Sequence, residues 1–218
     1  MIHPSTKLAY LSDDIGYGVV ATATIPVGTI VYVKDALEIV IDKQHALLRD
    51  PHYRDVIEKY SYTEADDCRV LSWDIAKYVN HSCASNTLST GYGFEIAVRD
   101  IQTGEQITDD YGMLNIERQM ACLCGEHHCR HVIGVNDFHH HAKHWDARVK
   151  SALAKLPDVE QPLAHYLDHE TRQSLEKYLD QKETYISVLK LQRPSARKHE
   201  QLESFDLSEI VQLANQPV

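Results

Sequence analysis

Asn80-His81-Ser82-Cys83 is the first of three polar segments that follow one another along this chain of 218 residues. The second ends in Asp109-Asp110-Tyr111, and the third is Cys122-Leu123-Cys124, with Cys129 a few residues further on. The first segment offers a carboxamide and an imidazole, the second a phenol, and the third thiols at a spacing typical of metal ligands. We therefore expect one site in which a cofactor is held, a reacting group is oriented and a metal lies close by.

The cysteines favour a metal over disulfides. Five cysteines are an odd number, and Cys122 and Cys124 are too close in sequence to form a bridge comfortably. Together with Cys129 they offer three soft thiolate ligands, and Gly125 gives the backbone freedom to wrap around one ion. The spacing therefore predicts a tetrahedral zinc site that still lacks one ligand.

The fourth zinc ligand must come from another part of the sequence. Cys83 is the natural candidate, because Cys68 belongs to an expected strand and is interpreted as a core residue. The competing ligands are the histidines near the cysteine segment, namely His127, His128 and His131. A separate run, His139-His140-His141, is expected to stay solvated, with a second metal site as the alternative.

Charge and hydropathy limit the partners that we expect. The formal net charge is −10, and residues 1–138 hold 20 Asp and Glu against 11 Lys and Arg. This acidity argues against direct nucleic-acid binding and suits a basic partner, such as a lysine-bearing tail or a histone-like protein, although it also fits a surface that is simply kept soluble. No secretory signal or membrane-spanning stretch is visible, so we expect no membrane contact and an intracellular, by default cytoplasmic, location, with the nucleus or a host cell left open.

Small paired strands are expected to dominate the chain up to Tyr111. Residues 17–24 and 29–33 are rich in Val, Ile, Thr and Tyr and are separated by a turn with Pro26 and Gly28, which predicts a β meander. Further strands are expected over residues 68–73, 92–98 and 106–109, the last two as a hairpin across Thr103-Gly104. Between them the pattern predicts a helix over residues 42–60 that Pro51 interrupts, and a short helical turn over residues 74–79.

Helices are expected after the cysteine segment, because no glycine follows Gly134. We expect one helix that begins at Asp137 and ends before Pro157, a second that begins at Thr171, and a last short one over residues 208–214. The apolar stripe on the first is expected to be a packing surface, made of Trp145, Val149, Leu153 and Leu156. We therefore divide the chain into a domain over residues 1–135 and a helical C-terminal region over residues 136–218.

These motifs resemble those of the SET-domain protein lysine methyltransferases. The resemblance rests on Gly16-Tyr17-Gly18, Asn80–Cys83, Gly104–Gly112 and a post-SET-like segment from Cys122 to Arg130. It covers a SET part at about residues 7–112 and a post-SET part at about residues 120–135. The fold class that it implies is β-rich α+β, with small sheets in a β-clip-like arrangement, a pseudoknot that threads the Asn-His segment, and the helical appendage after it.

The same resemblance implies an activity and the residues that carry it. The methyl donor would be S-adenosylmethionine, the acceptor a lysine ε-amine in a protein, and the zinc ion structural. By resemblance, the donor contacts the glycine segment, the Asn-His pair and the catalytic tyrosine, while four cysteines surround zinc. These residues are Gly16, Tyr17, Gly18, Asn80, His81 and Tyr111 for the donor, and Cys83, Cys122, Cys124 and Cys129 for the metal.

Two positions depart from the family pattern. Where the family commonly has an aromatic residue before Asp-Tyr, this chain has Asp109, and where it often has a Glu-Tyr pair, the chain has Val33-Lys34. Strand alternation places Asp109 on the same face as Tyr111, so we expect its carboxylate in the substrate channel. Tyr32 or Tyr78 would replace the missing aromatic hydroxyl. The alternative function is a zinc-stabilised interaction module that keeps the fold and has lost activity through these departures.

Overall fold

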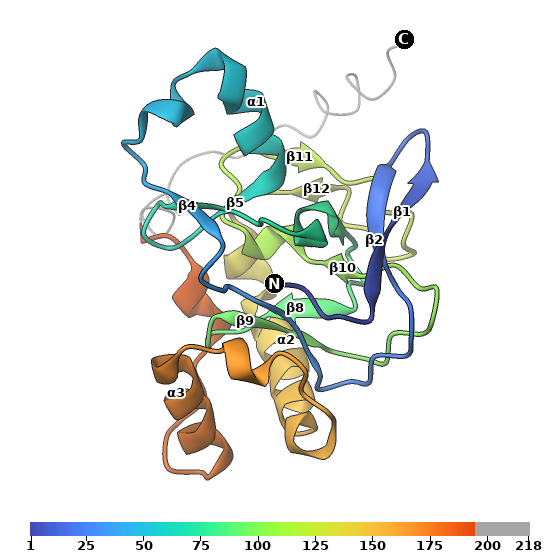
Figure 1. Cartoon of the computed structure of the whole chain (residues 1–218), viewed down its shortest axis with the longest axis vertical. Helices are drawn as coiled ribbons and strands as arrows, with labels where there is room; N and C mark the ends of the chain where they lie inside the picture. Colours follow the sequence, from blue (N-terminus) through green and yellow to red (C-terminus); the bar gives the residue numbers. More distant parts are fainter. Residues whose placement is uncertain (195–218) are drawn as a thin grey trace.

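The computed structural model describes residues 1–194, and Figure 1 shows them as small sheets with helices at two ends. The predicted helix over residues 208–214 lies outside the described residues. The strands are β1 (Thr6–Ser12), β2 (Gly16–Ala21), β3 (Ile30–Val33), β4 (Ile39–Ile41), β5 (Ser61–Thr63), β6 (Arg69–Leu71), β7 (Asn80–His81), β8 (Thr87–Ser89), β9 (Phe94–Ala97), β10 (Thr108–Asp109), β11 (Met120–Ala121) and β12 (Val132–Ile133).

Helices occupy the segments between and after these strands. The α-helices are α1 (Pro51–Tyr60), α2 (Asp137–Leu153) and α3 (His169–Leu179). The short 3-10 helices are η1 (Ala46–Leu48), η2 (Ile75–Tyr78), η3 (Tyr111–Met113), η4 (Leu156–Asp158), η5 (Ala164–Tyr166) and η6 (Val188–Leu191). None of the described helices has the length and apolar character needed to cross a bilayer.

The strand pairing corrects two predicted hairpins. β2 pairs with β1, which the sequence reading missed, and β3 pairs with β9, so the predicted meander is wrong. β9 is the middle strand of the sheet β3-β9-β8, and β10 pairs with β7, so the predicted hairpin across Thr103-Gly104 is also wrong. Phe94 and Ile96 of β9 are buried, and a buried strand needs hydrogen-bonded neighbours on both sides.

Two segments that are distant in sequence lie side by side at β7 and β10. This pair is parallel, with Asn80 opposite Thr108 and Asp109 opposite His81. These are the segments that the expected pseudoknot brings together. Because the pair is only two residues long, it is held from outside, and the buried Asn86 side chain does so by accepting the Thr108 amide at 2.8 Å and donating to the Gln106 carbonyl at 2.7 Å. The loop between β7 and β8, which carries Asn86, therefore fixes the position of β10 and of the residues that follow it, up to Tyr111.

The helix starts follow ordinary capping chemistry. The predicted break at Pro51 is confirmed, because Pro51 is the first residue of α1 and Asp50 caps it by accepting the His52 amide. Asp74 caps η2 in the same way and so fixes the segment that leads to Asn80. α3 begins at His169 and not at Thr171, because Asp168 is the cap and Thr171 donates its amide to it at 2.8 Å.

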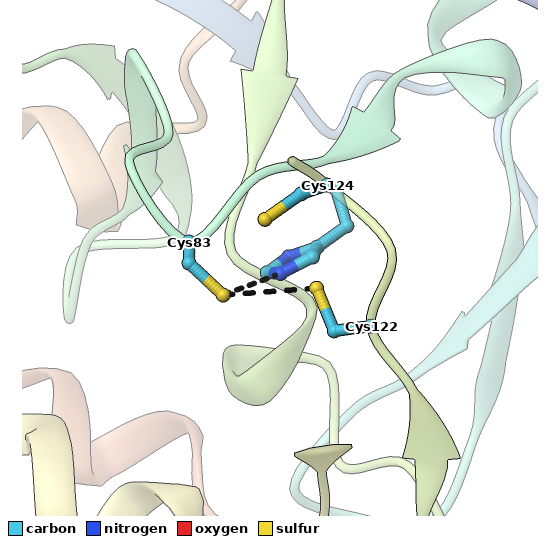
Figure 2. Close-up of side chains that lie close together, drawn as sticks. Cys83, Cys122 and Cys124 are labelled. Carbon is cyan, nitrogen blue, oxygen red and sulfur yellow. Dashed lines mark hydrogen bonds between the residues drawn. The ribbon is translucent and has the colours of Figure 1, made fainter. Parts of the chain in front are cut away.

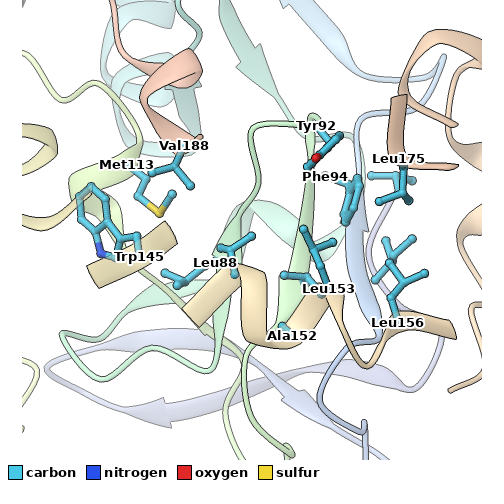
Figure 3. Packing of buried hydrophobic residues seen from close by; sticks show 14 of the residues in the cluster. Leu88, Tyr92, Phe94, Met113, Trp145, Ala152, Leu153, Leu156, Leu175 and Val188 are labelled. Carbon is cyan, nitrogen blue, oxygen red and sulfur yellow. The ribbon is translucent and has the colours of Figure 1, made fainter. Parts of the chain in front are cut away.

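The C-terminal helices share a hydrophobic core with the small sheets, as Figure 3 shows. The predicted stripe of Trp145, Val149, Leu153 and Leu156 is buried, and it packs against residues of β3, β8 and β9 such as Leu88. A second buried cluster lies under β2 and includes Val19, Ile25 and Ile101. The predicted division of the chain near residue 135 remains a prediction, since one continuous core includes residues from both sides of that point.

Candidate functional site

Four potential metal ligands converge where β7 meets the cysteine segment. The ligand atoms of His81, Cys83, Cys122 and Cys124 all lie within 4.8 Å of one another. The Cys83 and Cys122 sulfurs are 3.7 Å apart, and the His81 Nε2 lies 3.3 Å from the Cys83 sulfur. Figure 2 shows the side chains of Cys83, Cys122 and Cys124 close together. The structure therefore brings Cys83 together with two of the later cysteines, and their binding of zinc stays a prediction.

The geometry and chemistry of this cluster fit zinc. Four Zn–S bonds of about 2.3 Å in a tetrahedron separate the sulfurs by about 3.8 Å, close to the Cys83–Cys122 distance. Backbone amides already point at sulfur, since Arg130 donates to Cys83 at 3.4 Å. Although burial acts in the other direction, hydrogen bonds from the Cys83 and Glu126 amides lower the pKa of Cys124 to about 7. Such a thiol is readily deprotonated, as a zinc ligand must be.

Cys129 lies at the edge of the cluster. Its sulfur is not among the four converging ligand atoms. It is 3.5 Å from the Cys122 carbonyl oxygen and accepts the His131 amide at 3.3 Å. Its thiol also interacts with the thiols of Cys122 and Cys124. Cys68 is apart from the cluster and half-buried at the start of β6, so the interpretation of Cys68 as a core residue is wrong.

His81 connects the thiol cluster to Tyr111. The His81 Nδ1 accepts the Tyr111 amide at 3.1 Å, and the two rings lie 5.5 Å apart. The Tyr111 hydroxyl donates to the Val79 carbonyl at 2.7 Å. Burial, with the nearby charges of Asp109 and Glu95, raises the pKa of Tyr111 above its ordinary value. The phenol is therefore neutral and held in a fixed orientation between the two ends of β7.

The glycine segment at the start of β2 lies against Asn80. The Asn80 Nδ2 donates to the Tyr17 carbonyl at 3.1 Å. A Cβ at Gly18 would lie 2.8 Å from that Nδ2 and 2.7 Å from the Gln106 Oε1, so only glycine allows this approach. Tyr17 itself is 52% exposed and packs edge-on against Tyr78. The segments predicted to hold the donor, Gly16–Gly18 and Asn80–His81, are thus neighbours in space.

An ion-pair network joins the site to the C-terminal helix. Asp110 binds the Arg130 guanidinium at 2.5 Å through one oxygen and the Trp145 indole N–H at 2.9 Å through the other. The second arm of Arg130 reaches Asp137 at 3.1 Å. All three charged side chains are at most 15% exposed. Gly112 makes the contact possible, because a Cβ there would lie 2.6 Å from the Asp137 Oδ2. Helix α2 therefore fixes the residue that precedes Tyr111.

Two cavities flank the site. A cavity of about 450 Å³ is lined by Tyr111, Asp109, Val79 and residues from the end of α1 and from β5. A second, of about 350 Å³, lies between β5 with the residues that follow it and the loop before β9. Residues common to both linings form a shared wall, namely Tyr32, Tyr62, Thr63, Glu95 and Leu114. The arrangement suits two molecules that approach one reaction centre from different sides.

Two carboxyls face the larger cavity, that of the buried Asp109 and that of the half-buried Glu95. Asp109 is 3% exposed, and its Oδ1 has no hydrogen-bond partner among the described residues. Burial and the charge of Glu95 raise the pKa of Asp109 well above its ordinary value, against the opposing hydrogen bond from the Asp110 amide. Burial likewise raises the pKa of Glu95 to about 7. The sequence predicted the Asp109 carboxylate near Tyr111, and the structure adds Glu95 as a second carboxyl at the same cavity.

The aromatic hydroxyls at the cavity were predicted only in part. Tyr32 lines the cavity, where its hydroxyl donates to Glu38 at 2.8 Å. Tyr78 is absent from the lining and stacks on Tyr17 and Tyr60 instead. Tyr62 and Glu95 line the cavity and were missed by the sequence reading. The only local signal for Glu95 is a single charge in the apolar run Phe94–Ala97.

In a comparison with known proteins, a family model matches the part of the chain that contains the proposed site. The SET-domain model matches residues 16–112, which hold the glycine segment, β7, β10 and Tyr111. A histone-lysine N-methyltransferase specific for H3 lysine-36 from Cryptococcus neoformans is 28% identical over 144 residues, which are 57% of this chain and 16% of that protein. The H3 lysine-4-specific histone-lysine N-methyltransferase of Schizosaccharomyces pombe is 38% identical over 64 residues, which are 26% of this chain and 7% of that protein.

Among solved structures, the methyltransferase domain of human histone-lysine N-methyltransferase SETMAR shares 18% identity with a TM-score of 0.42, covering 62% of this chain and 58% of that one. KRYPTONITE in complex with mCHG DNA and SAH shares 21% identity with a TM-score of 0.42, covering 59% of this chain and 29% of that one. The matched part of the chain spans less than a fifth of the length of the Cryptococcus and Schizosaccharomyces proteins named above.

Proposed function

This chain contains a SET domain over residues 16–112, and from that premise we propose that it is a protein-lysine N-methyltransferase that uses S-adenosylmethionine. The observation that carries the proposal is the convergence of three segments. Asn80 contacts the glycine segment, His81 holds the Tyr111 amide, and Tyr111 faces a cavity. Methyl transfer to nitrogen depends mainly on the alignment of the reacting atoms, and such a rigid site supplies alignment.

Gly16–Gly18, Asn80 and His81 would hold the donor. The close approach at Gly18 packs the backbone of the glycine segment against Asn80 and so keeps the two proposed donor-binding segments together. When bound, the donor supplies a methyl group on a cationic sulfur.

Tyr111 orients the acceptor. Its hydroxyl is fixed on the Val79 carbonyl, so the phenol oxygen keeps a lone pair for the acceptor's N–H. A lysine amine has a pKa of about 10.4 in water and must lose its proton before it can act as a nucleophile. Desolvation in the cavity and the cationic sulfur of the donor disfavour the ammonium form and promote that loss, against the nearby carboxyls, which hold the ammonium. Neither function of the cavity needs a metal ion in contact with the acceptor.

The zinc ion that we propose is structural, with Cys83, Cys122, Cys124 and Cys129 as ligands. Cys83 lies two residues after the end of β7, so the ion would tie the Asn-His segment to the segment after β11. We favour Cys129 over His81 as the fourth ligand, because the His81 Nδ1 accepts the Tyr111 amide, which places the proton of the neutral ring on Nε2 and leaves that nitrogen no lone pair for a metal. The closed ligand set leaves no open position for catalysis.

The acceptor class is a lysine in a basic protein, which the excess of carboxylates would attract. The relatives are named for histone lysines, so core histones and a lysine-rich lysate fraction are the first acceptors to test. We expect label from methyl-labelled S-adenosylmethionine to appear as methyl-lysine after hydrolysis. If S-adenosylmethionine binds but no acceptor gains label, the alternative of an inactive zinc-stabilised interaction module is the better account.

A further inference from the structure

The cavity that contains Tyr111 has an acidic floor that no other part of the site uses. Asp109 comes from the end of β10, and Glu95 comes from the middle of β9. Both line the larger cavity, and Glu95 lines the second one as well. Glu95 therefore belongs to the wall that the cavities share, and Asp109 lies on the larger cavity's side of it, where an acceptor side chain would end.

The surrounding charges compensate these carboxyls only in part. Among the described residues, no group forms a hydrogen bond with the buried Asp109 Oδ1. Arg148 acts electrostatically on Asp109, but its guanidinium donates to the Ser85 carbonyl at 2.6 Å, and the N-terminal ammonium of Met1 acts on Glu95. The carboxylate of Asp110 and the neutral phenols of Tyr111 and Tyr62 also act on the pair. An unpaired buried acceptor costs free energy of folding, so its retention indicates a ligand that donates to it.

We propose that Glu95 and Asp109 form a recognition site for an amine that still carries N–H groups, and that they act as its counter-ion and hydrogen-bond acceptors. The inference rests on the proposed function only in assigning this amine to the methyl acceptor. A primary ammonium offers three donors and a full charge to the pair. Each methyl group added to the nitrogen removes one donor and enlarges the head group.

The consequence for the reaction is a limit on methylation. An unmethylated or monomethylated lysine keeps enough N–H groups to contact Tyr111 and the acidic pair together. A trimethylated product keeps none, and it would leave the Asp109 Oδ1 unpaired again. The pair thus favours early acceptors over late ones, by about tenfold or more for each charge-assisted hydrogen bond that is lost.

Binding of two simple amines tests the site without methyl transfer. n-Butylammonium reproduces the end of a lysine side chain, and n-butyltrimethylammonium has the same charge without N–H donors. We would titrate each into the full chain, with and without S-adenosylhomocysteine, and follow NMR shifts. Wild type should bind n-butylammonium at least about tenfold more tightly. Asp109→Asn and Glu95→Gln should each reduce that preference, whereas Asp55→Asn, an exposed carboxylate on α1, should not.

The outcomes separate this inference from the proposed function. Equal affinity for the two amines, no binding of n-butylammonium, or an unchanged preference in both variants contradicts the amine site. Selective binding without any methyl transfer to proteins supports the amine site and contradicts the proposed function. Where transfer occurs, mass spectra should show little trimethyl-lysine with wild type and more with Asp109→Ala, which removes the carboxylate and adds space.

Discussion

The hydroxyl of Tyr111 donates a hydrogen bond of 2.7 Å to the carbonyl oxygen of Val79, the residue directly before Asn80. This bond spans the junction of β7 and β10, so the phenol is positioned by the same strand that carries the Asn-His pair. One short segment of backbone therefore fixes both sides of the proposed site, the one for the acceptor and the one for the donor. A change on either side is expected to misalign the other.

Tyr111→Phe tests whether that hydroxyl is needed for transfer or for folding. The variant loses one hydrogen bond, so we expect unfolding to become easier by only about 1 kcal/mol. Methyl transfer should fall by about 10²-fold or more, because the acceptor is no longer oriented. Calorimetric titration with S-adenosylmethionine should still show binding. Transfer at a wild-type rate in this variant would remove Tyr111 from the mechanism.

The Asp110–Arg130–Asp137 network predicts a large loss of stability. Arg130→Met leaves two buried carboxylates without their cation, and breaking such a pair costs about 3–5 kcal/mol. The control is Arg193→Met, which removes more exposed ion pairs with Asp67 and Glu117 and should cost about 1 kcal/mol or less. Urea unfolding gives both values. Equal losses in the two variants would show that the buried network has no special weight.

Zinc content tests the cysteine cluster directly. Purified protein should contain about one zinc ion per chain, and X-ray absorption should show four sulfur neighbours at about 2.3 Å. Cys122→Ser should lose most of the metal, whereas Cys68→Ser should keep it, since Cys68 lies apart from the cluster. A spectrum with three sulfurs and one nitrogen would instead assign His81 as the fourth ligand. Full zinc content in Cys122→Ser would contradict the site.

Trp145→Ala tests whether the C-terminal helix is part of the folded unit. Trp145 is 1% exposed and donates to Asp110, so the variant should lose about 3–5 kcal/mol of unfolding free energy. Trp73→Ala is the matched control, because Trp73 is 41% exposed and its indole bonds, within residues 1–194, to Asp35 alone. It should lose about 1 kcal/mol. If Trp145→Ala reduces protection from hydrogen exchange in α2 alone, then α2 and the small sheets unfold independently.

Stability should depend on pH through Glu95. Burial raises its folded pKa from 4.5 to about 7. The folded state therefore binds the proton of Glu95 more tightly than the unfolded state does. This contributes stability below the unfolded pKa of about 4.5, and the contribution is lost as the pH rises through about 7. Glu95→Gln should remove this loss. Between pH 5 and pH 8, the free energy of unfolding of the variant in urea should therefore rise relative to that of wild type, by an amount on the order of 1–3 kcal/mol.

Glu105→Gln is the opposite control for that pH dependence. Although burial acts in the other direction, the Arg99 guanidinium lowers the pKa of Glu105 below its ordinary value. Its contribution to stability is therefore present above the unfolded pKa and is lost as pH falls. The Glu105→Gln variant should differ most from wild type near neutral pH and least in acid. The same trend in both variants would contradict the assignment for Glu95.

Local chemistry made the site predictable, and long-range pairing limited what the sequence told of the fold. The break at Pro51, the helical turn that begins near Asp74 and the start of α2 depend on neighbouring residues, so the sequence predicted them closely. The partners of β2 and β9 depend on which strands bury the same core, and no local signal carries that. Glu95 was missed for the same reason, since strand alternation alone would place its side chain in solvent.

The cysteine segment shows both effects in one place. Its spacing predicted a metal cluster that includes Cys83, and the structure brings Cys122 and Cys124 together with Cys83. The contact of Arg130 with Asp110 and Asp137 was not predicted, because it requires α2 to fold back over the residue before Tyr111. The helical region was expected as an appendage, yet it shares the core and supplies part of the support of the site.

Mass spectrometry of a lysate gives the most direct test of the central claim. Lysate proteins would be incubated with deuteromethyl S-adenosylmethionine and either wild type or Tyr111→Phe. The proposed function predicts deuteromethyl groups on lysine side chains of basic proteins with wild type and almost none with the variant. Absence of labelled lysine with wild type, or equal labelling by both proteins, would contradict it.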